Sequence, residues 1–223
     1  MANCCYVVYK CVGERKQLDE LAAALHKVMN RKMTEVENKW GKTWMGWLVT
    51  ALQGDATSYP LRGKICDFND DKEVLTITQE TEWEEQRELR VFLKERFPAI
   101  DIYYTEEEPG GEVFATNDME GRLFPFRYLL DGHDDAQYFR TLEDAAIAVA
   151  DIAGREVAPE EEEIDEALDD FMEIHEGEFF SFHCLKKETR RCWRGKETRQ
   201  ARAGYGWTIT HKNRIDLKQN SYE

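Results

Sequence analysis

The stretch VLTITQETEWEEQRELRVFLKERFPAIDIYY, residues 74–104, predicts a strand, a helix and a second strand in succession. Residues 74–80 are rich in β-branched side chains, which favour a strand. The apolar residues that follow recur at helical spacing on one face: Leu89, Phe92, Leu93 and Phe97. Pro98 ends that helix. Beyond it every second residue points to the same face of a strand: Ile100, Ile102 and Tyr104.

The chain before this stretch predicts a matching half. Residues 4–12, CCYVVYKCV, indicate a strand that ends at Gly13, and residues 18–29 carry one apolar helical stripe. KICDFN at 64–69 reaches the strand at 74–80 through a connection of hairpin length. The order βαββαβ predicts an α+β fold, a ferredoxin-like antiparallel sheet with its helices on one face. Aromatic residues at helical spacing predict a helical insertion at 34–52.

Further strands and helices are predicted after this core. GEVFATND and GRLFPFRYLLDG indicate two strands around the turn NDMEG at 117–121. Thr141 and Gly154 bound one predicted helix as N-cap and C-terminal stop, and Pro159 starts a second, acidic helix. EFFSFHCLKKE and GYGWTITHK indicate extra C-terminal strands. We therefore expect a core at 1–130 and a C-terminal extension at 131–223 that packs on it.

Three segments carry a family resemblance: MANCCY at the start, LTITQETEW, and RFPAIDIYYTEEEPGGEVFATN. Together they resemble the YubB-like ferredoxin-like family of bacterial plasmids, phages and integrated mobile elements, over roughly residues 1–130. The matching positions are Met1, Ala2, Asn3, Cys5, Trp83, Phe97, Pro98, Tyr104, Glu107 and Gly110. Cys4 stands where the family usually has Trp, and EEQ replaces a proline-rich start of the second helix. The resemblance implies the fold and a structural motif of Trp83, Tyr104, Glu107 and Gly110, but no activity.

Charge and cysteine content indicate a cytoplasmic protein with an acidic body. The net charge is −15, yet Cys184 to Glu223 holds eleven Lys and Arg against four Asp and Glu. The first ten residues lack the pattern of a secretory signal, and no apolar run has the length of a membrane span, so no membrane partner is expected. Six unevenly spaced cysteines favour free thiols.

The run Glu106–Glu108 follows a strand and enters a Pro-Gly-Gly turn. Alternation places Glu106 and Glu108 on one face and Glu107 on the other. A carboxylate pair there holds a cation or does acid–base work only if a pocket brings it a partner. The simpler interpretation is a charged strand end that needs no ligand. A bracing contact from Glu107 to the next hairpin stays open beside it.

Metal and catalytic motifs are missing from the sequence. His175, His183, Cys184 and Cys192 are close in sequence but include no closely spaced cysteine pair, so no zinc site is predicted. The phosphate-loop, dinucleotide, nucleophile-elbow and zinc-protease motifs are also missing. We expect no cofactor and no enzymatic activity.

The basic C-terminal segment combines cations with aromatic rings, as surfaces that bind single-stranded nucleic acid do. Its candidate contact residues are Arg190, Arg191, Trp193, Arg194, Lys196, Arg199, Arg202, Tyr205 and Trp207. Three roles remain open: docking on the acidic helix predicted at 159–173, binding nucleic acid, and binding an acidic protein. The sequence as a whole favours a non-enzymatic accessory protein of a mobile element that acts as a protein-interaction module, with nucleic-acid binding as the alternative.

Overall fold

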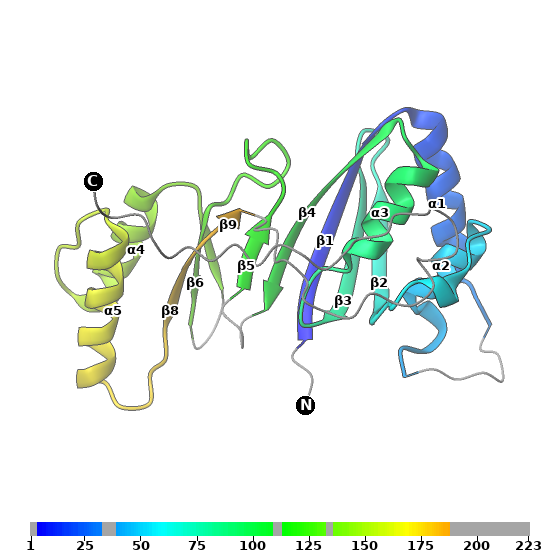
Figure 1. The fold of residues 1–223 in the computed structure, drawn as a ribbon. Coiled ribbons are helices and arrows are strands. Elements are labelled where there is room, and N and C mark those ends of the chain that lie inside the picture. The colour runs from blue at the N-terminus through cyan, green and yellow to red at the C-terminus, as the bar shows by residue number, and fades with distance from the viewer. Residues whose placement is uncertain (1–3, 33–38, 109–112, 133–135, 188–223) are drawn as a thin grey trace, which may run out of the picture. The chain divides into compact units, whose positions relative to one another are not determined.

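The computed structural model contains a six-stranded sheet, in which five strands come from the first 116 residues of the chain and the sixth is β9 (Figure 1). The structure describes residues 4–32, 39–108, 113–132 and 136–187. The strands lie in the order β2-β3-β1-β4-β5-β9, and all neighbours are antiparallel except β5 and β9. Their bounds are β1 Cys4–Gly13, β2 Gly63–Asp70, β3 Leu75–Glu82, β4 Ile100–Glu108, β5 Val113–Thr116 and β9 Lys186–Lys187. The predicted mixed α+β class with an antiparallel sheet is confirmed.

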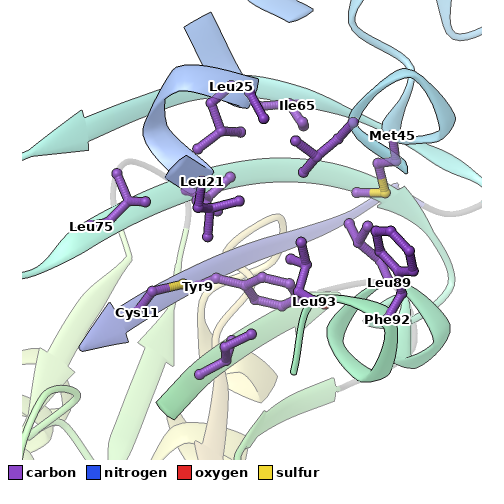
Figure 2. Close-up of a cluster of buried hydrophobic side chains, with 14 of the residues drawn as sticks. Tyr9, Cys11, Leu21, Leu25, Met45, Ile65, Leu75, Leu89, Phe92 and Leu93 are labelled. Atoms are coloured by element: carbon purple, nitrogen blue, oxygen red, sulfur yellow. The ribbon is translucent and has the colours of Figure 1, made fainter. Parts of the chain in front are cut away.

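One face of this sheet is buried under helices. The side chains of Cys5, Val7, Tyr9 and Cys11 alternate along β1 and are fully buried, because successive residues of a strand point to opposite faces. They pack with helices α1 (Arg15–Met29), α2 (Met45–Ala51) and α3 (Arg87–Arg96). Figure 2 shows this cluster, with Tyr9 and Cys11 of β1 among side chains of all three helices.

The predicted helix at 34–52 differs from the structure. Residues 33–38 lie outside the described part, a short 3₁₀ helix covers Gly41–Thr43, and α2 begins only at Met45. Gly41 has a φ of 69°, and Trp44 is extended with a ψ of 135°. These two residues interrupt the helical backbone, although the aromatic and apolar residues around them recur at helical spacing. The spacing therefore predicted a helix that begins earlier than α2 does.

A second, three-stranded sheet carries the rest of the described chain. It has the order β7-β6-β8, with β6 at Tyr128–Asp131, β7 at Gln137–Phe139 and β8 at Ser181–Cys184. Helices α4 (Leu142–Ala153) and α5 (Glu161–Ile174) pack on it around Leu130, Val149 and Ile164. Thr141 caps α4 by accepting from Asp144 N–H at 3.2 Å, and Gly154 ends it at a φ of 65°, as predicted.

The two strands predicted at 111–118 and 121–132 correspond to β5 and β6, but these strands lie in different sheets. β5 pairs with β4 and β9, whereas β6 pairs with β7 and β8. The carboxylate of Asp118 accepts hydrogen bonds from three successive N–H groups, those of Arg122, Leu123 and Phe124. The chain after β5 is thereby held in a loop, and β7 falls in a stretch for which the sequence predicted no helix or strand.

The side-chain amide of Gln79 is buried in the main core without a hydrogen-bond partner among the described residues. The Gln79 side chain is fully buried on β3, and neither amide atom has a partner in the described part of the chain. We expect Gln79→Met to raise the free energy of unfolding by about 1–3 kcal/mol, because the amide is desolvated without compensation. Urea denaturation measures the change.

Thr81 offers a matched control, because it lies two residues after Gln79 on the same face of β3. The buried hydroxyl of Thr81 donates to the carbonyl oxygen of Glu84 at 2.8 Å. We therefore expect Thr81→Val to lower the free energy of unfolding by about 1 kcal/mol, since a satisfied hydrogen bond is lost. A loss of stability in Gln79→Met would show that the amide is satisfied in solution.

Candidate interaction surface

Trp83 lies in a strained turn between β3 and α3. Its φ is 72°, a value that bulky side chains rarely adopt. Glu84 N–H donates to the carbonyl oxygen of Glu82 at 2.9 Å and closes a three-residue turn with Trp83 at its centre. A γ-turn of this hand is rare. The indole is 49% exposed, so burial of the ring does not explain the conformation.

The turn is fastened on both sides by hydrogen bonds. Glu82 N–H donates to the carbonyl oxygen of Arg62 at 3.0 Å, and Arg62 N–H donates to Oε1 of Gln86 at 2.8 Å. Glu85 N–H donates to Oε2 of Glu106, on β4, at 2.6 Å. The residues on either side of Trp83 are therefore tied to the sheet and to the segment that leads into β2.

Glu85 forms the centre of a buried polar cluster beneath this turn. Its carboxylate accepts from the hydroxyl of Tyr9 and, at 2.9 Å, from Nε of Arg90. The Arg90 guanidinium also lies 4.7 Å from the centre of the Tyr104 ring. Burial, and then the nearby Glu85 carboxylate, raise the pKa of Tyr9 well above its usual value, so its hydroxyl stays protonated and donates. The cluster anchors α3 and the Trp83 turn to β1.

The predicted structural motif is thus spread over three environments. Trp83 is exposed, Tyr104 is buried against Arg90 and Tyr9, and Glu107 points to the opposite face of β4. Gly110 lies outside the described residues. The sequence had given no sign of Glu85 as the centre of the cluster, because its contact with Tyr9 joins residues 76 positions apart.

Glu107 connects the main sheet to the second sheet. Its Oε2 accepts from the hydroxyl of Tyr138 on β7 at 2.7 Å. Burial and the nearby Asp131 carboxylate raise the pKa of Glu107, and the Tyr138 hydrogen bond opposes the rise. In the Glu106–Glu108 run, Glu106 and Glu107 thus accept hydrogen bonds from Glu85 N–H and the Tyr138 hydroxyl, and Glu108 is buried.

The raised pKa of Glu107 predicts a pH effect on stability. Between the unfolded and the higher folded pKa, the folded state binds more protons, so stability decreases as the pH rises through that window. Glu107→Gln should remove this slope and change stability at pH 7 by less than about 1 kcal/mol, because the amide oxygen still accepts from Tyr138. Unfolding of both proteins at several pH values from 4 to 7 measures the difference. A wild-type slope that persists in Glu107→Gln would contradict the assignment.

The possible metal ligands of the described residues are dispersed, and the Cys5 and Cys11 thiols are buried. No group of three or more His, Cys, Asp and Glu side chains is placed to hold a metal ion there. The five cysteines of that part are free of disulfides. Burial raises the pKa of the Cys5 and Cys11 thiols to about 12, so both stay protonated and unreactive near neutral pH.

The basic C-terminal segment falls outside the described residues. This applies to all nine predicted contact residues: Arg190, Arg191, Trp193, Arg194, Lys196, Arg199, Arg202, Tyr205 and Trp207. Docking on the acidic helix, nucleic-acid binding and binding of an acidic protein therefore stay predictions. No helix in the described ranges has both the length and the apolar character needed to cross a membrane.

Comparisons with known proteins do not identify a family. No family model matches the chain, and no curated protein matches it. Among solved structures the chain is similar to one described as an unknown protein from Galdieria sulphuraria, at 9% identity, over 83% of this chain and 100% of that one. The TM-score is 0.24, which carries no argument about fold or function. The YubB-like resemblance stays a prediction.

Proposed function

We propose that the protein is a non-enzymatic protein-interaction module and that the Trp83 turn is its recognition element. The observation that carries this proposal is an indole 49% exposed on a residue with a φ of 72°. A left-handed conformation costs a residue with a side chain about 1–2 kcal/mol. Strain of this kind concentrates at functional sites, and Trp is enriched among the residues that dominate binding energies at protein interfaces.

The Glu85 cluster supports a binding role for the turn. A recognition residue contributes most to affinity when its backbone is held rigid before binding, because less conformational entropy is lost on binding. The charge of Glu85 is compensated by Arg90, and Tyr9 is held protonated. These groups thus satisfy one another and hold the turn, which is a structural use of ionisable residues.

We further propose that β1, α1, β2, β3, α3 and β4 form a ferredoxin-like unit related to the YubB-like family. The strand order β2-β3-β1-β4 and the antiparallel pairing support this assignment. The sequence motifs around Trp83 and Tyr104 support the relationship. On this view the protein is a cytoplasmic accessory protein of a bacterial mobile element.

Co-purification with a matched pair of variants tests the proposed function. Trp83→Gly removes the indole and places the residue that best tolerates positive φ at this position. Met119→Ala removes another side chain that is 50% exposed. We expect the tagged wild-type protein to bring down a stoichiometric partner from its native cells, Met119→Ala to retain it and Trp83→Gly to lose it.

Stability measurements separate recognition from folding in this experiment. Trp83→Gly should unfold at the same or a higher denaturant concentration than wild type, because backbone strain is relieved. A lower midpoint would mean that the indole is needed for packing, and the proposal would then fail. A wild-type protein that elutes without any partner, or a partner that Trp83→Gly retains, would overturn it as well.

A further inference from the structure

We propose that Trp83 binds a cationic side chain of the partner, an arginine guanidinium before a lysine ammonium. This inference rests on the proposed function and names the chemistry of the group that the Trp83 turn recognises. It starts from a comparison with the contacts that the other indoles make within the same protein. A positive charge over the face of an indole is attracted by the negative face of the ring.

The other described tryptophans already have ring or cation partners from their own chain. The guanidinium of Arg31 lies 3.7 Å from the centre of the Trp47 ring, and the ammonium of Lys39 lies 4.9 Å from that of Trp40. Trp44 packs edge-on against Trp47 at 5.5 Å and donates from Nε1 to the carbonyl oxygen of Leu61. Among the described residues neither an aromatic ring nor a cation covers the indole of Trp83.

The charges around the Trp83 turn favour a positive partner group. Glu82 and Glu84 flank Trp83 directly, and Glu88 follows in the first turn of α3. Glu82 is paired with Lys39, whereas Glu84 and Glu88 have no ion pair within the described ranges. Arg87 is the nearest cation in sequence, and its guanidinium does not cover the indole. A partner carboxylate would meet Glu84 and Glu88, whereas a partner guanidinium would complement them.

Arginine is preferred over lysine for a geometric reason. The planar guanidinium stacks on an aromatic face and still directs its N–H groups sideways toward carboxylates, whereas an ammonium is more strongly hydrated. The protein uses the same arrangement internally, where Arg90 covers Tyr104 and donates to Glu85. The partner implied by this geometry is a protein segment with an exposed arginine.

A fluorine NMR titration tests the inference on the full chain. 5-Fluorotryptophan replaces all six tryptophans, and Trp83→Phe assigns the signal of residue 83. The probe is acetylated nona-arginine amide, and its uncharged control is the nona-citrulline analogue. We expect a saturable shift of the residue 83 signal with the arginine peptide only. The Trp40 and Trp47 signals should move less, because both rings already carry a cation.

A graded substitution then isolates the contribution of the ring face. Site-specific incorporation of mono-, di- and trifluorotryptophan at position 83 weakens the negative ring face stepwise while keeping its shape. Affinity for the arginine peptide should fall about twofold with each fluorine if a cation lies over the ring. Trp83→Leu, which keeps an apolar side chain without a π face, should lose most of the residue's contribution.

The outcomes distinguish this inference from the proposed function. Equal shifts with the arginine and citrulline peptides, or an affinity insensitive to fluorination, would overturn the cation assignment. If Trp83→Gly still loses the native partner in that case, the interaction module stands and the ring is used as an apolar anchor. If Trp83→Gly also retains the partner, the proposed function fails with the inference.

Discussion

The Arg90→Met variant is expected to lose about 3–5 kcal/mol in its free energy of unfolding, because one partner is removed from a buried ion pair. The Arg90 side chain is 16% exposed and that of Glu85 only 5%. Without the guanidinium, the Glu85 carboxylate stays desolvated next to the Tyr9 hydroxyl. Urea denaturation followed by tryptophan fluorescence and by circular dichroism measures the loss.

A double variant separates the stability that the Glu85–Arg90 ion pair contributes from the cost of leaving one buried charge unpaired. Replacing both partners, as in Glu85→Leu with Arg90→Met, should recover most of the loss, since apolar groups of similar size often substitute for a buried pair at little expense. Asp101→Ala breaks the exposed Lys94–Asp101 pair but keeps the hydrogen bond from Lys94 to the carbonyl oxygen of Ile100, so it should change stability by less than about 1 kcal/mol. An Arg90→Met variant that loses no more stability than Asp101→Ala would contradict the structural role of the cluster.

Local patterns in the sequence predicted the elements of the main sheet well. The alternation of Ile100, Ile102 and Tyr104 and the helical spacing from Leu89 to Phe97 both correspond to structure, in β4 and α3. Such patterns are visible because a strand or a helix buries one face repeatedly. Thr141 and Gly154 were likewise identified from capping chemistry that acts within four residues.

Contacts between distant residues were not predictable in the same way. Glu85 lies under the turn and accepts hydrogen bonds from Tyr9 and Arg90. No sequence spacing encodes a contact of this separation. The positive φ of Trp83 was also hidden, because the residue at this position is a tryptophan and not the glycine or asparagine that usually adopts such a conformation.

The segment after β5 shows why the second sheet was missed. A turn-rich stretch between two apolar runs is typical of a hairpin, and NDMEG has that composition. In the structure the side chain of Asn117 continues the ladder of β5, with Oδ1 accepting from Tyr104 N–H at 2.7 Å and Nδ2 donating to the carbonyl oxygen of Ile102 at 2.9 Å. Asn117 therefore extends the pairing with β4, the outer edge of β5 pairs with β9, and Asp118 redirects the chain.

Asp118→Ala should therefore lose about 3–5 kcal/mol, because three backbone N–H groups lose a buried charged acceptor at once. The residue is 1% exposed, and its oxygens lie 3.2, 2.7 and 2.8 Å from the nitrogens of Arg122, Leu123 and Phe124. Asp71 offers a matched control, since it accepts from Glu73 and Val74 N–H in an exposed turn. Its replacement by Ala should lower stability by only about 1 kcal/mol.

The pH dependence of Asp118 gives a second, independent measurement of the same role. Burial acts to raise the pKa of Asp118, but the three N–H donors and the Arg127 charge outweigh it and bring the pKa below its usual value. A carboxylate with a lowered folded pKa stabilises the protein above its unfolded pKa, and that stabilisation is lost as the pH falls through the folded pKa. The stability difference between wild type and Asp118→Asn should accordingly shrink below about pH 4. A difference that stays constant down to pH 2 would show that the charge of Asp118 does not hold the loop.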